Sequence, residues 1–234
     1  MAMTKNAFES GSTCPPLKDD ILRIYSMRYC PFAHRTRLVL HHKNIPFEIV
    51  NIHLKKKPDW YLEKNPFGTV PTLEQGDKIV YESNICNVYL DEAYPGEKLI
   101  STDPYQKARD QILIDTFGRI SGIFFKVVAS GENKEDLFKE LKRYEQALKE
   151  RGNYFGGNKP NMVDYTIWPL FERFVLLENR GHKLDPSEFP CLTAYIKRMK
   201  EVPAVKAAMM DDQSHEGFMK SYLSDPVPNY DYGL

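Results

Sequence analysis

The sequence predicts an α/β domain with a mixed four-stranded sheet, followed by an all-α helical domain. Between residues 21 and 98, short β-branched runs alternate with stretches whose apolar residues recur at helical spacing. From Asp103 onward, only the helical spacing remains. The composition changes near residues 99–105, and this change places the boundary between the two domains there.

The first domain opens with a strand at residues 21–26 and a helix that begins at Pro31. Proline is favoured in the first turn of a helix, and apolar residues follow at helical spacing until about Asn44, just before Pro46. Residues 47–52 form the next strand. Because a helix connects these two strands, they should be parallel.

The rest of the first domain is predicted to hold a short helix, a hairpin and a longer helix. The short helix covers residues 58–64. Two β-runs at 70–74 and 78–81 flank a turn around Gly76, so they should pair antiparallel. The longer helix follows at 83–94. A mixed sheet with helices on both faces satisfies this order, and this is the thioredoxin-like arrangement.

The second part of the chain is predicted to be helical throughout. Asp103 and Pro104 supply an N-cap and a first-turn proline, and residues 161–164 resemble a capping box. Apolar stripes at helical spacing occur at residues 112–127, 137–148, 167–174 and 192–199. The predicted organisation is a flexible N-terminal arm at 1–19, a first domain at 20–98, a linker at 99–106 and a helical domain at 107–234.

Composition narrows the classes of function. The 234 residues carry 32 Lys and Arg against 32 Asp and Glu, and this balance argues against nucleic acid, which requires a basic surface. No window of about 18 apolar residues predicts a membrane span, and no apolar segment near the start predicts a secretory signal. No motif for a metal, a nucleotide or a dinucleotide occurs. The 4 cysteines lack the spacing of a disulfide scaffold or a zinc site, so free thiols in the cytoplasm are predicted.

Cys30 stands where a strand ends and a helix begins, a position that favours a reactive thiolate. Backbone N–H groups are unpaired at the start of a helix. We expect those of Phe32 and Ala33 to stabilise the thiolate, with Arg28 or Arg35 as candidate cations. Ala33 also takes the place of the second cysteine in a dithiol motif. A mixed disulfide at Cys30 must therefore be resolved by an external thiol, which implies a small thiol cosubstrate.

A longer pattern surrounds this cysteine. The string YSMRYCPFA at residues 25–33 continues as RTRLVL at 35–40. Further motifs follow at residues 57–60, 65–68, 70–71, 81–83, 89–96, 155–157, 164–165, 167–169, 171–173 and 231–234. This pattern, which extends from about residue 20 to the end, closely resembles the omega class of cytosolic glutathione transferases.

The resemblance implies that glutathione is the thiol cosubstrate and that Cys30 forms a mixed disulfide with it. Phe32 would line the pocket near the sulfur. Val70 precedes a proline that is expected to be cis, and the Val70 backbone would pair with the cysteinyl part of glutathione like an added strand.

The resemblance also implies three polar contacts with glutathione. Lys57 would pair with the glycyl carboxylate, and Glu82 would meet the α-ammonium group. Ser83, at a helix N-terminus, would hold the γ-glutamyl carboxylate through its hydroxyl and its N–H group. A second pocket between the domains would bind the acceptor, with Leu170, Arg173, His215 and Tyr222 as candidate residues. Leu170 and His215 replace aromatic residues of the best-known mammalian members, so a different acceptor preference is expected.

The leading hypothesis is a glutathione-dependent thiol transferase or reductase that serves detoxification. Its expected acceptors are dehydroascorbate, glutathione mixed disulfides and methylated arsenic acids. Alternatives are conjugation of glutathione to electrophiles, with Tyr25 or Ser26 activating the thiol, and the synthesis of pteridine pigments. A non-enzymatic alternative is a ligand-holding protein or a relative of the chloride intracellular channel proteins. The charge between Arg35 and Lys57 argues against stable membrane insertion. Family members usually dimerise, so we expect a homodimer.

Overall fold

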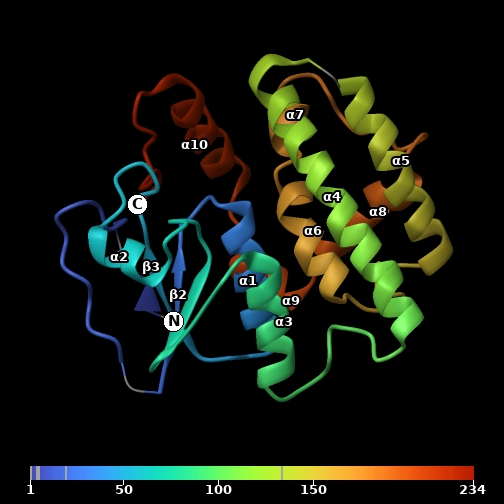
Figure 1. The fold of residues 1–234 in the computed structure, drawn as a ribbon. Helices are drawn as coiled ribbons and strands as arrows, with labels where there is room; N and C mark the ends of the chain where they lie inside the picture. Colours follow the sequence, from blue (N-terminus) through green and yellow to red (C-terminus); the bar gives the residue numbers. More distant parts are fainter. Residues whose placement is uncertain (1, 4–5, 19, 133) are drawn as a thin grey trace. The chain divides into compact units, whose positions relative to one another are not determined.

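The chain folds into two compact units in the computed structural model, which describes residues 2–3, 6–18, 20–132 and 134–234 (Figure 1). The first unit comprises Met1–Glu97 together with Gln213–Leu234, and the second comprises Lys98–Asp212. The helical domain predicted from the sequence extended to residue 234. The last helix instead belongs to the first unit, for reasons given below.

A mixed sheet forms the centre of the first unit, with the strand order β1-β3-β2-β4-β5. Its strands are Ala2–Met3 (β1), Leu22–Ser26 (β2), Phe47–Asn51 (β3), Thr72–Gln75 (β4) and Lys78–Tyr81 (β5). β2 and β3 are parallel, as the helical connection between them predicts, and β4 pairs antiparallel with both β2 and β5. The four predicted strands are thus confirmed. The two-residue β1 pairs parallel with β3 and extends the sheet at its edge.

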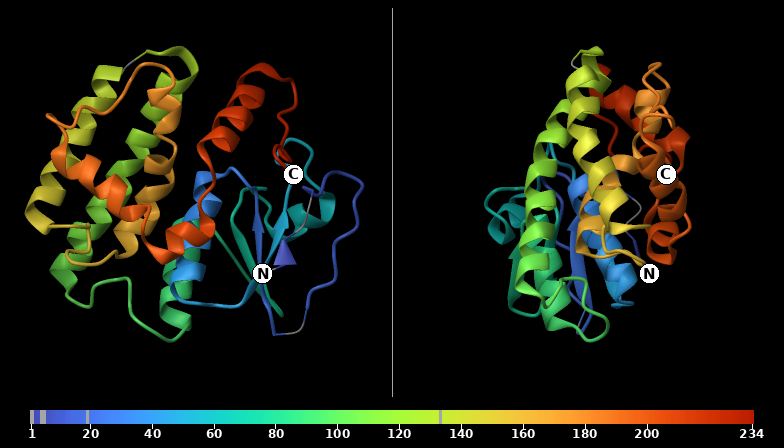
Figure 2. Two further views of the ribbon diagram at one scale, coloured as in Figure 1. Left: turned by 180° about the vertical axis from the view of Figure 1, so that it is seen from behind. Right: turned by 90° about the vertical axis from the view of Figure 1, so that its right-hand side faces the viewer.

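Three helices of the first unit cover this sheet. They are α1 (Pro31–His42), α2 (Asp59–Lys64) and α3 (Ser83–Ala93). α1 and α3 lie side by side, and the sheet separates them from α2 (Figures 1 and 2). The hydroxyl of Thr36 in α1 donates to the side-chain oxygen of Asn87 in α3 at 2.9 Å. A buried ion pair of 3.2 Å between Lys43 and Asp91 joins the same two helices. These contacts hold the middle and the C-terminal end of α1 against α3.

The N-terminal segment is held against the sheet in its described residues, and this differs from the flexible arm predicted for residues 1–19. The N–H of Phe8 donates to the carbonyl of Asn51 at 2.8 Å, and the N–H of His53 donates to the carbonyl of Phe8 at 2.9 Å. The Trp60 indole donates to the carbonyl of Ser12 at 2.9 Å. The physical reason is the open edge of β3, whose backbone groups accept another extended segment.

The second unit is helical, as the sequence predicts. Its helices are α4 (Pro104–Ser130), α5 (Lys134–Arg151), α6 (Met162–Glu172), α7 (Val175–Glu178), α8 (Pro190–Met199) and α9 (Pro203–Ala208). Both views in Figure 2 show α4 and α5 running alongside each other. Asp103 caps α4 by accepting from the N–H of Gln106 at 2.7 Å. The predicted capping box at the start of α6 is present, with Asn161 and Asp164 as its two members.

The last helix, α10 (Asp212–Ser224), and the residues after it pack on the first unit. The Tyr29 ring stacks on Phe218 of α10 with a centroid distance of 4.2 Å. The Tyr29 hydroxyl donates to the carbonyl of Tyr232 at 2.5 Å, and Asp231 accepts from the N–H of Ala7 at 2.8 Å. These contacts, made across some 200 positions of sequence, explain why a helix-by-helix prediction assigned α10 to the wrong unit.

None of the helices in the described ranges combines the length and hydrophobicity that a membrane crossing requires.

Candidate active site

Cys30 is the N-cap residue of α1, directly after the turn that follows β2. The N–H of Ala33, one of the two predicted donors, points at the Cys30 sulfur from 3.5 Å. The side chain is 7% exposed, and its Sγ lies 3.8 Å from the carbonyl oxygen of Val70. The Ala33 N–H, a backbone donor at a helix start, stabilises the thiolate form of Cys30, whereas the Val70 carbonyl can accept only from its thiol form.

The segment before β4 lies next to the cysteine. The Val70–Pro71 peptide bond is cis, as expected from the resemblance. Val70 is buried, and its carbonyl faces the sulfur. The hydroxyl of Tyr61, from α2, donates to the carbonyl of Thr69, so α2 supports the chain directly before Val70. Backbone groups of Val70 are therefore held beside the reactive sulfur.

Glu82 and Ser83 form an unusual start to α3. Glu82 has φ 71° and ψ 119°, a conformation that L-residues rarely adopt, and its exposed side chain does not cap the helix. Ser83, the first helical residue, is buried. A strained residue at a helix N-terminus without a side-chain cap is typical of functional sites that bind an anion. The predicted role of Ser83 in holding a carboxylate fits this local structure.

Lys57 passes over the backbone of Gly68. Gly68 has φ 61°, and a Cβ atom built there would lie 2.7 Å from Cδ and 2.8 Å from Cε of Lys57. Only glycine leaves this space free. The aliphatic part of Lys57 is thereby guided along the loop that precedes Val70, while the side chain stays partly exposed. Among the described residues, the Lys57 ammonium group takes part in no ion pair.

Phe32 and Arg35 lie on the first turns of α1. The Phe32 ring is 43% exposed, and the guanidinium carbon of Arg35 lies 4.8 Å from its centroid. Arg35 is buried and donates to the Ser83 hydroxyl at 3.4 Å. Burial lowers the pKa of Arg35 to about 10, while the charge of Cys30 acts in the opposite direction. Arg35 therefore remains positively charged at neutral pH, beside Ser83 and the Phe32 ring.

The two hydroxyls considered for thiol activation are unsuited to that role. Tyr25 is fully buried, and its hydroxyl donates to the Glu74 carboxylate at 2.5 Å. Burial raises the pKa of Tyr25, whereas activation of a thiol requires a hydroxyl that ionises easily or is aimed at the sulfur. Ser26 is also fully buried. Conjugation driven by either hydroxyl is therefore disfavoured.

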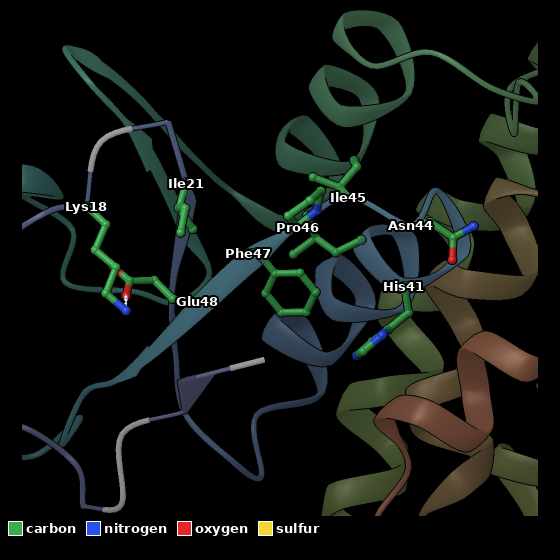
Figure 3. A pocket seen from close by; sticks show the side chains of 9 residues that line it. Lys18, Ile21, His41, Asn44, Ile45, Pro46, Phe47 and Glu48 are labelled. Carbon is green, nitrogen blue, oxygen red and sulfur yellow. Dashed lines mark ion pairs between the residues drawn. The ribbon is translucent and has the colours of Figure 1, made fainter.

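A separate cavity of about 420 Å³ occurs in the first unit, at the end of α1 opposite to Cys30 (Figure 3). It is lined by Lys18, Ile21, Leu40, His41, Asn44, Ile45, Pro46, Phe47 and Glu48. Two of the lining side chains, Lys18 and Glu48, form an ion pair with each other, with 3.4 Å between Nζ and Oε2. The Glu48 carboxylate also pairs with Arg23, with 2.6 Å between Oε1 and Nη2. This cavity holds none of the predicted site residues. Within the described ranges, no group of three His, Cys, Asp or Glu side chains is placed to hold a metal ion.

Comparisons with known proteins show which family the chain belongs to. Residues 24–98 match the glutathione S-transferase N-terminal domain, and residues 127–198 match the C-terminal domain. The chain is 40% identical to glutathione S-transferase omega-1 of Sus scrofa over 233 residues, which are 96% of this chain and 95% of that protein. It is 43% identical to pyrimidodiazepine synthase of Drosophila melanogaster, over 94% of this chain and 93% of that protein. The chain belongs to the omega class of glutathione transferases.

Solved structures support the same fold. Glutathione transferase Omega 3C from Trametes versicolor has a TM-score of 0.73 and 26% identity, and the match covers 88% of this chain and 91% of that one. Rice GST1, solved in complex with glutathione, has a TM-score of 0.82 at 22% identity, over 93% of this chain and 100% of that one. The glutathione transferase family uses glutathione as its cosubstrate.

The predicted acceptor residues of this transferase are divided between the two units. Leu170 and Arg173 are buried in the second unit, where the Arg173 guanidinium donates to the carbonyl of Pro169. His215 and Tyr222 lie on α10 in the first unit. His215 is buried, and its ring is 6.4 Å from that of Tyr29. Tyr222 is 49% exposed.

Two tyrosines near Cys30 were missed by the sequence analysis of this transferase. Tyr61 of α2 and Tyr230 of the C-terminal segment both interact electrostatically with Cys30. Burial raises the pKa of both hydroxyls, so both are neutral near pH 7. The sequence offered no local signal for Tyr230, since its proximity to Cys30 depends on the packing of α10. The Tyr61 hydroxyl contact depends likewise on the folded loop before Val70.

Proposed function

We propose that this omega-class transferase is a glutathione-dependent thiol transferase and reductase that acts through a mixed disulfide at Cys30. The proposal rests mainly on one observation, the Cys30 sulfur at the start of α1 with the Ala33 N–H directed at it. The residue that donates this bond also occupies the place of a second cysteine. The site therefore suits a one-cysteine mechanism in which an external thiol completes the cycle.

The reaction with a glutathione mixed disulfide takes two exchange steps. The Cys30 thiolate attacks the glutathione sulfur. A new bond joins the two sulfurs, the old disulfide breaks, and the acceptor leaves as a thiolate that takes up a proton. A second glutathione, after losing its proton, then attacks the glutathione sulfur bound to Cys30. Oxidised glutathione leaves, and Cys30 returns to its thiolate form.

Reduction of dehydroascorbate also consumes two electrons, as reduction of a disulfide does. Two glutathione molecules supply two electrons and two protons, and they leave as one molecule of oxidised glutathione. Methylated arsenic acids are a third class of acceptor in this proposal. The free cysteines of the chain suit a reducing compartment, and we place the activity in the cytoplasm.

The proposed glutathione contacts follow the local structures described above. The Val70 backbone pairs with the cysteinyl part, and the uncapped start of α3 at Ser83 holds the γ-glutamyl carboxylate. Glu82 meets the α-ammonium group, Lys57 meets the glycyl carboxylate, and the exposed Phe32 ring borders the sulfur.

A comparison of rates tests the proposed function. Turnover is measured with dehydroascorbate, a glutathione mixed disulfide and an aryl halide, for the unchanged protein and for Cys30→Ala. We expect the first two activities to fall by at least about 100-fold in the variant, because its nucleophile is gone. Reductase turnover that survives the change would refute the mechanism. Binding of glutathione without turnover of any acceptor would favour a ligand-holding protein instead.

A second candidate function is a glutathione-dependent step in pteridine-pigment synthesis. The specific observation in its favour is the 43% identity to pyrimidodiazepine synthase of Drosophila melanogaster. The same thiol chemistry at Cys30 would serve it. Product analysis with a reduced pteridine substrate and glutathione separates this function from general thiol transfer.

We also propose that the protein forms a homodimer through the side of the first unit that carries Phe67. This side chain is 72% exposed, and its ring lies 5.9 Å from that of Tyr81. Ile79, two residues before Tyr81 on the same strand, is also exposed. A second copy would cover these apolar groups. Light scattering should give twice the 27.2 kDa chain mass, and Phe67→Ser should lower it towards one chain. A single-chain mass for the unchanged protein would contradict the dimer.

A further inference from the structure

A buried hydrogen-bond network holds the loop that carries Val70, and its central residues take no part in the exchange steps. Asn65, the C-cap residue of α2, and Thr72, the first residue of β4, are both fully buried. The Asn65 side-chain nitrogen Nδ2 lies 3.0 Å from the Thr72 hydroxyl and 3.0 Å from the carbonyl oxygen of Thr69. The network therefore joins the residue before Val70 to the residue after Pro71.

The direction of each bond in this network is fixed by its neighbours. The Oδ1 atom of Asn65 accepts from the N–H of Phe67 at 3.1 Å, so the Nδ2 atom is left to donate. The Tyr61 hydroxyl donates to the carbonyl of Thr69. This bond uses its single proton, so the Thr72 hydroxyl is the donor in its 3.0 Å contact with Tyr61. The Thr72 hydroxyl thus donates to Tyr61, accepts from Asn65 and links α2 to β4.

The network fixes the loop without using the peptide groups of Val70. In the described part of the chain, neither the N–H nor the carbonyl of Val70 takes part in a backbone–backbone hydrogen bond. The carbonyl oxygen lies 3.8 Å from the Cys30 sulfur, so an extended peptide that pairs with Val70 lies beside that sulfur. Buried polar groups that are fully paired hold one geometry strictly. The bonds at Thr69 and Thr72 therefore set where the Val70 peptide groups stand.

We propose that Asn65 and Thr72 are positioning residues that hold the Val70 backbone in register with the cysteinyl part of glutathione. This inference rests on the proposed function and deepens it. The network also reaches the glycyl end of the tripeptide, because Lys57 directly precedes α2 and its side chain passes close to Gly68 in the same loop. α2 and the loop at residues 65–72 therefore act as one unit that sets both contacts.

The test compares Thr72→Val with Thr72→Ser. The first keeps the shape of the side chain and removes the hydroxyl, and the second keeps the hydroxyl. Thr36→Val is the matched control, because Thr36 is also fully buried and its hydroxyl donates to Asn87 at 2.9 Å, between α1 and α3. Calorimetric titration with S-methylglutathione gives Kd for each variant, and urea unfolding gives its stability.

We expect Thr72→Val to raise Kd at least about fivefold, which corresponds to about 1 kcal/mol of binding free energy. Thr72→Ser and Thr36→Val should remain within about twofold of the unchanged protein. The two valine variants should lose similar stability, because each loses a buried hydroxyl of the same kind. In kinetics with a glutathione mixed disulfide, Thr72→Val should raise KM by a similar factor and leave kcat within about twofold, as expected for a loss of uniform binding.

A Kd within about twofold in folded Thr72→Val overturns the inference, and so does an equal rise in Thr36→Val or in Thr72→Ser. If Thr72→Val does not fold, Tyr61→Phe takes its place with the same expected rise, because it removes the hydroxyl to which Thr72 donates. The titration involves no disulfide chemistry. Weaker binding by Thr72→Val, with no reductase turnover by the unchanged protein, upholds the positioning role and overturns the proposed function. An unchanged Kd with a mixed disulfide formed at Cys30 does the reverse.

Discussion

Replacing Gly68 by alanine should weaken glutathione binding, because Gly68 leaves room for the Lys57 side chain. The left-handed backbone at φ 61° costs an alanine about 1–2 kcal/mol, part of which is offset by a less flexible unfolded chain. We therefore expect a loss of about 1 kcal/mol in the free energy of unfolding, or about 2–4 °C in melting temperature. In addition, the new Cβ would lie 2.7 Å from Cδ of Lys57, so the lysine must move.

The size of the binding effect follows from the exposure of Lys57. A partly exposed ion pair is worth about 0.2–1 kcal/mol, so loss of the pair with the glycyl carboxylate should raise Kd by about 1.4- to 5-fold. Calorimetric titration with S-methylglutathione measures this directly, because this ligand keeps the carboxylate and forms no disulfide. Gly76→Ala is the matched control. Its φ is 60°, but no atom lies within 4 Å of the added Cβ.

The two variants should lose similar stability, and only Gly68→Ala should lose affinity. Lys57→Met should lose affinity to the same extent, and combining it with Gly68→Ala should cause no further loss, since both changes remove one contact. Equal affinities for Gly68→Ala and Gly76→Ala would refute this role of Gly68. Additive losses in the double variant would show that Lys57 and Gly68 act separately.

Three further predictions concern strain, packing and pH. Glu82→Gly should raise the free energy of unfolding by about 1 kcal/mol, because glycine adopts φ 71° without strain, and should raise the KM for glutathione, because the carboxylate is lost. Thermal melts and steady-state kinetics check both effects. Tyr29→Phe keeps the stack on Phe218 and removes the bond to Tyr232, so urea unfolding should show a loss of about 1 kcal/mol. Burial raises the pKa of the Asp164 carboxyl to about 6, above the ordinary 3.8 of the unfolded chain. The folded state therefore binds more protons, and stability should fall as the pH rises between these values. Asp164→Asn should flatten that part of the stability profile, and an unchanged slope would contradict the assignment.

Local patterns in the sequence were sufficient for much of the fold. The parallel pair β2 and β3, the hairpin of β4 and β5, and the cap of α6 each depend on neighbouring residues and on short connections. The position of Cys30 at the start of α1 was predictable for the same reason, because the N-cap and the following proline are adjacent in sequence.

The remaining features depend on contacts between distant residues. The bond between Arg35 and Ser83 spans 48 positions, and the bond between Tyr29 and Tyr232 spans 203. The spacing of apolar residues within one helix cannot predict such long-range contacts. The backbone of Glu82 could not be predicted for a different reason. Glutamate rarely adopts a positive φ, so the sequence pattern predicts an ordinary helix cap at this position. These long-range and strained features are the ones closest to the proposed site.

Trapping of the mixed disulfide is the most direct test of the role of Cys30. The protein is mixed with a glutathione mixed disulfide in the absence of free glutathione, and its peptides are examined by mass spectrometry. We predict that glutathione is carried by the peptide that contains Cys30, and that Cys30→Ser abolishes both this adduct and turnover. Glutathione found on another cysteine, or turnover that survives Cys30→Ser, would contradict the mechanism.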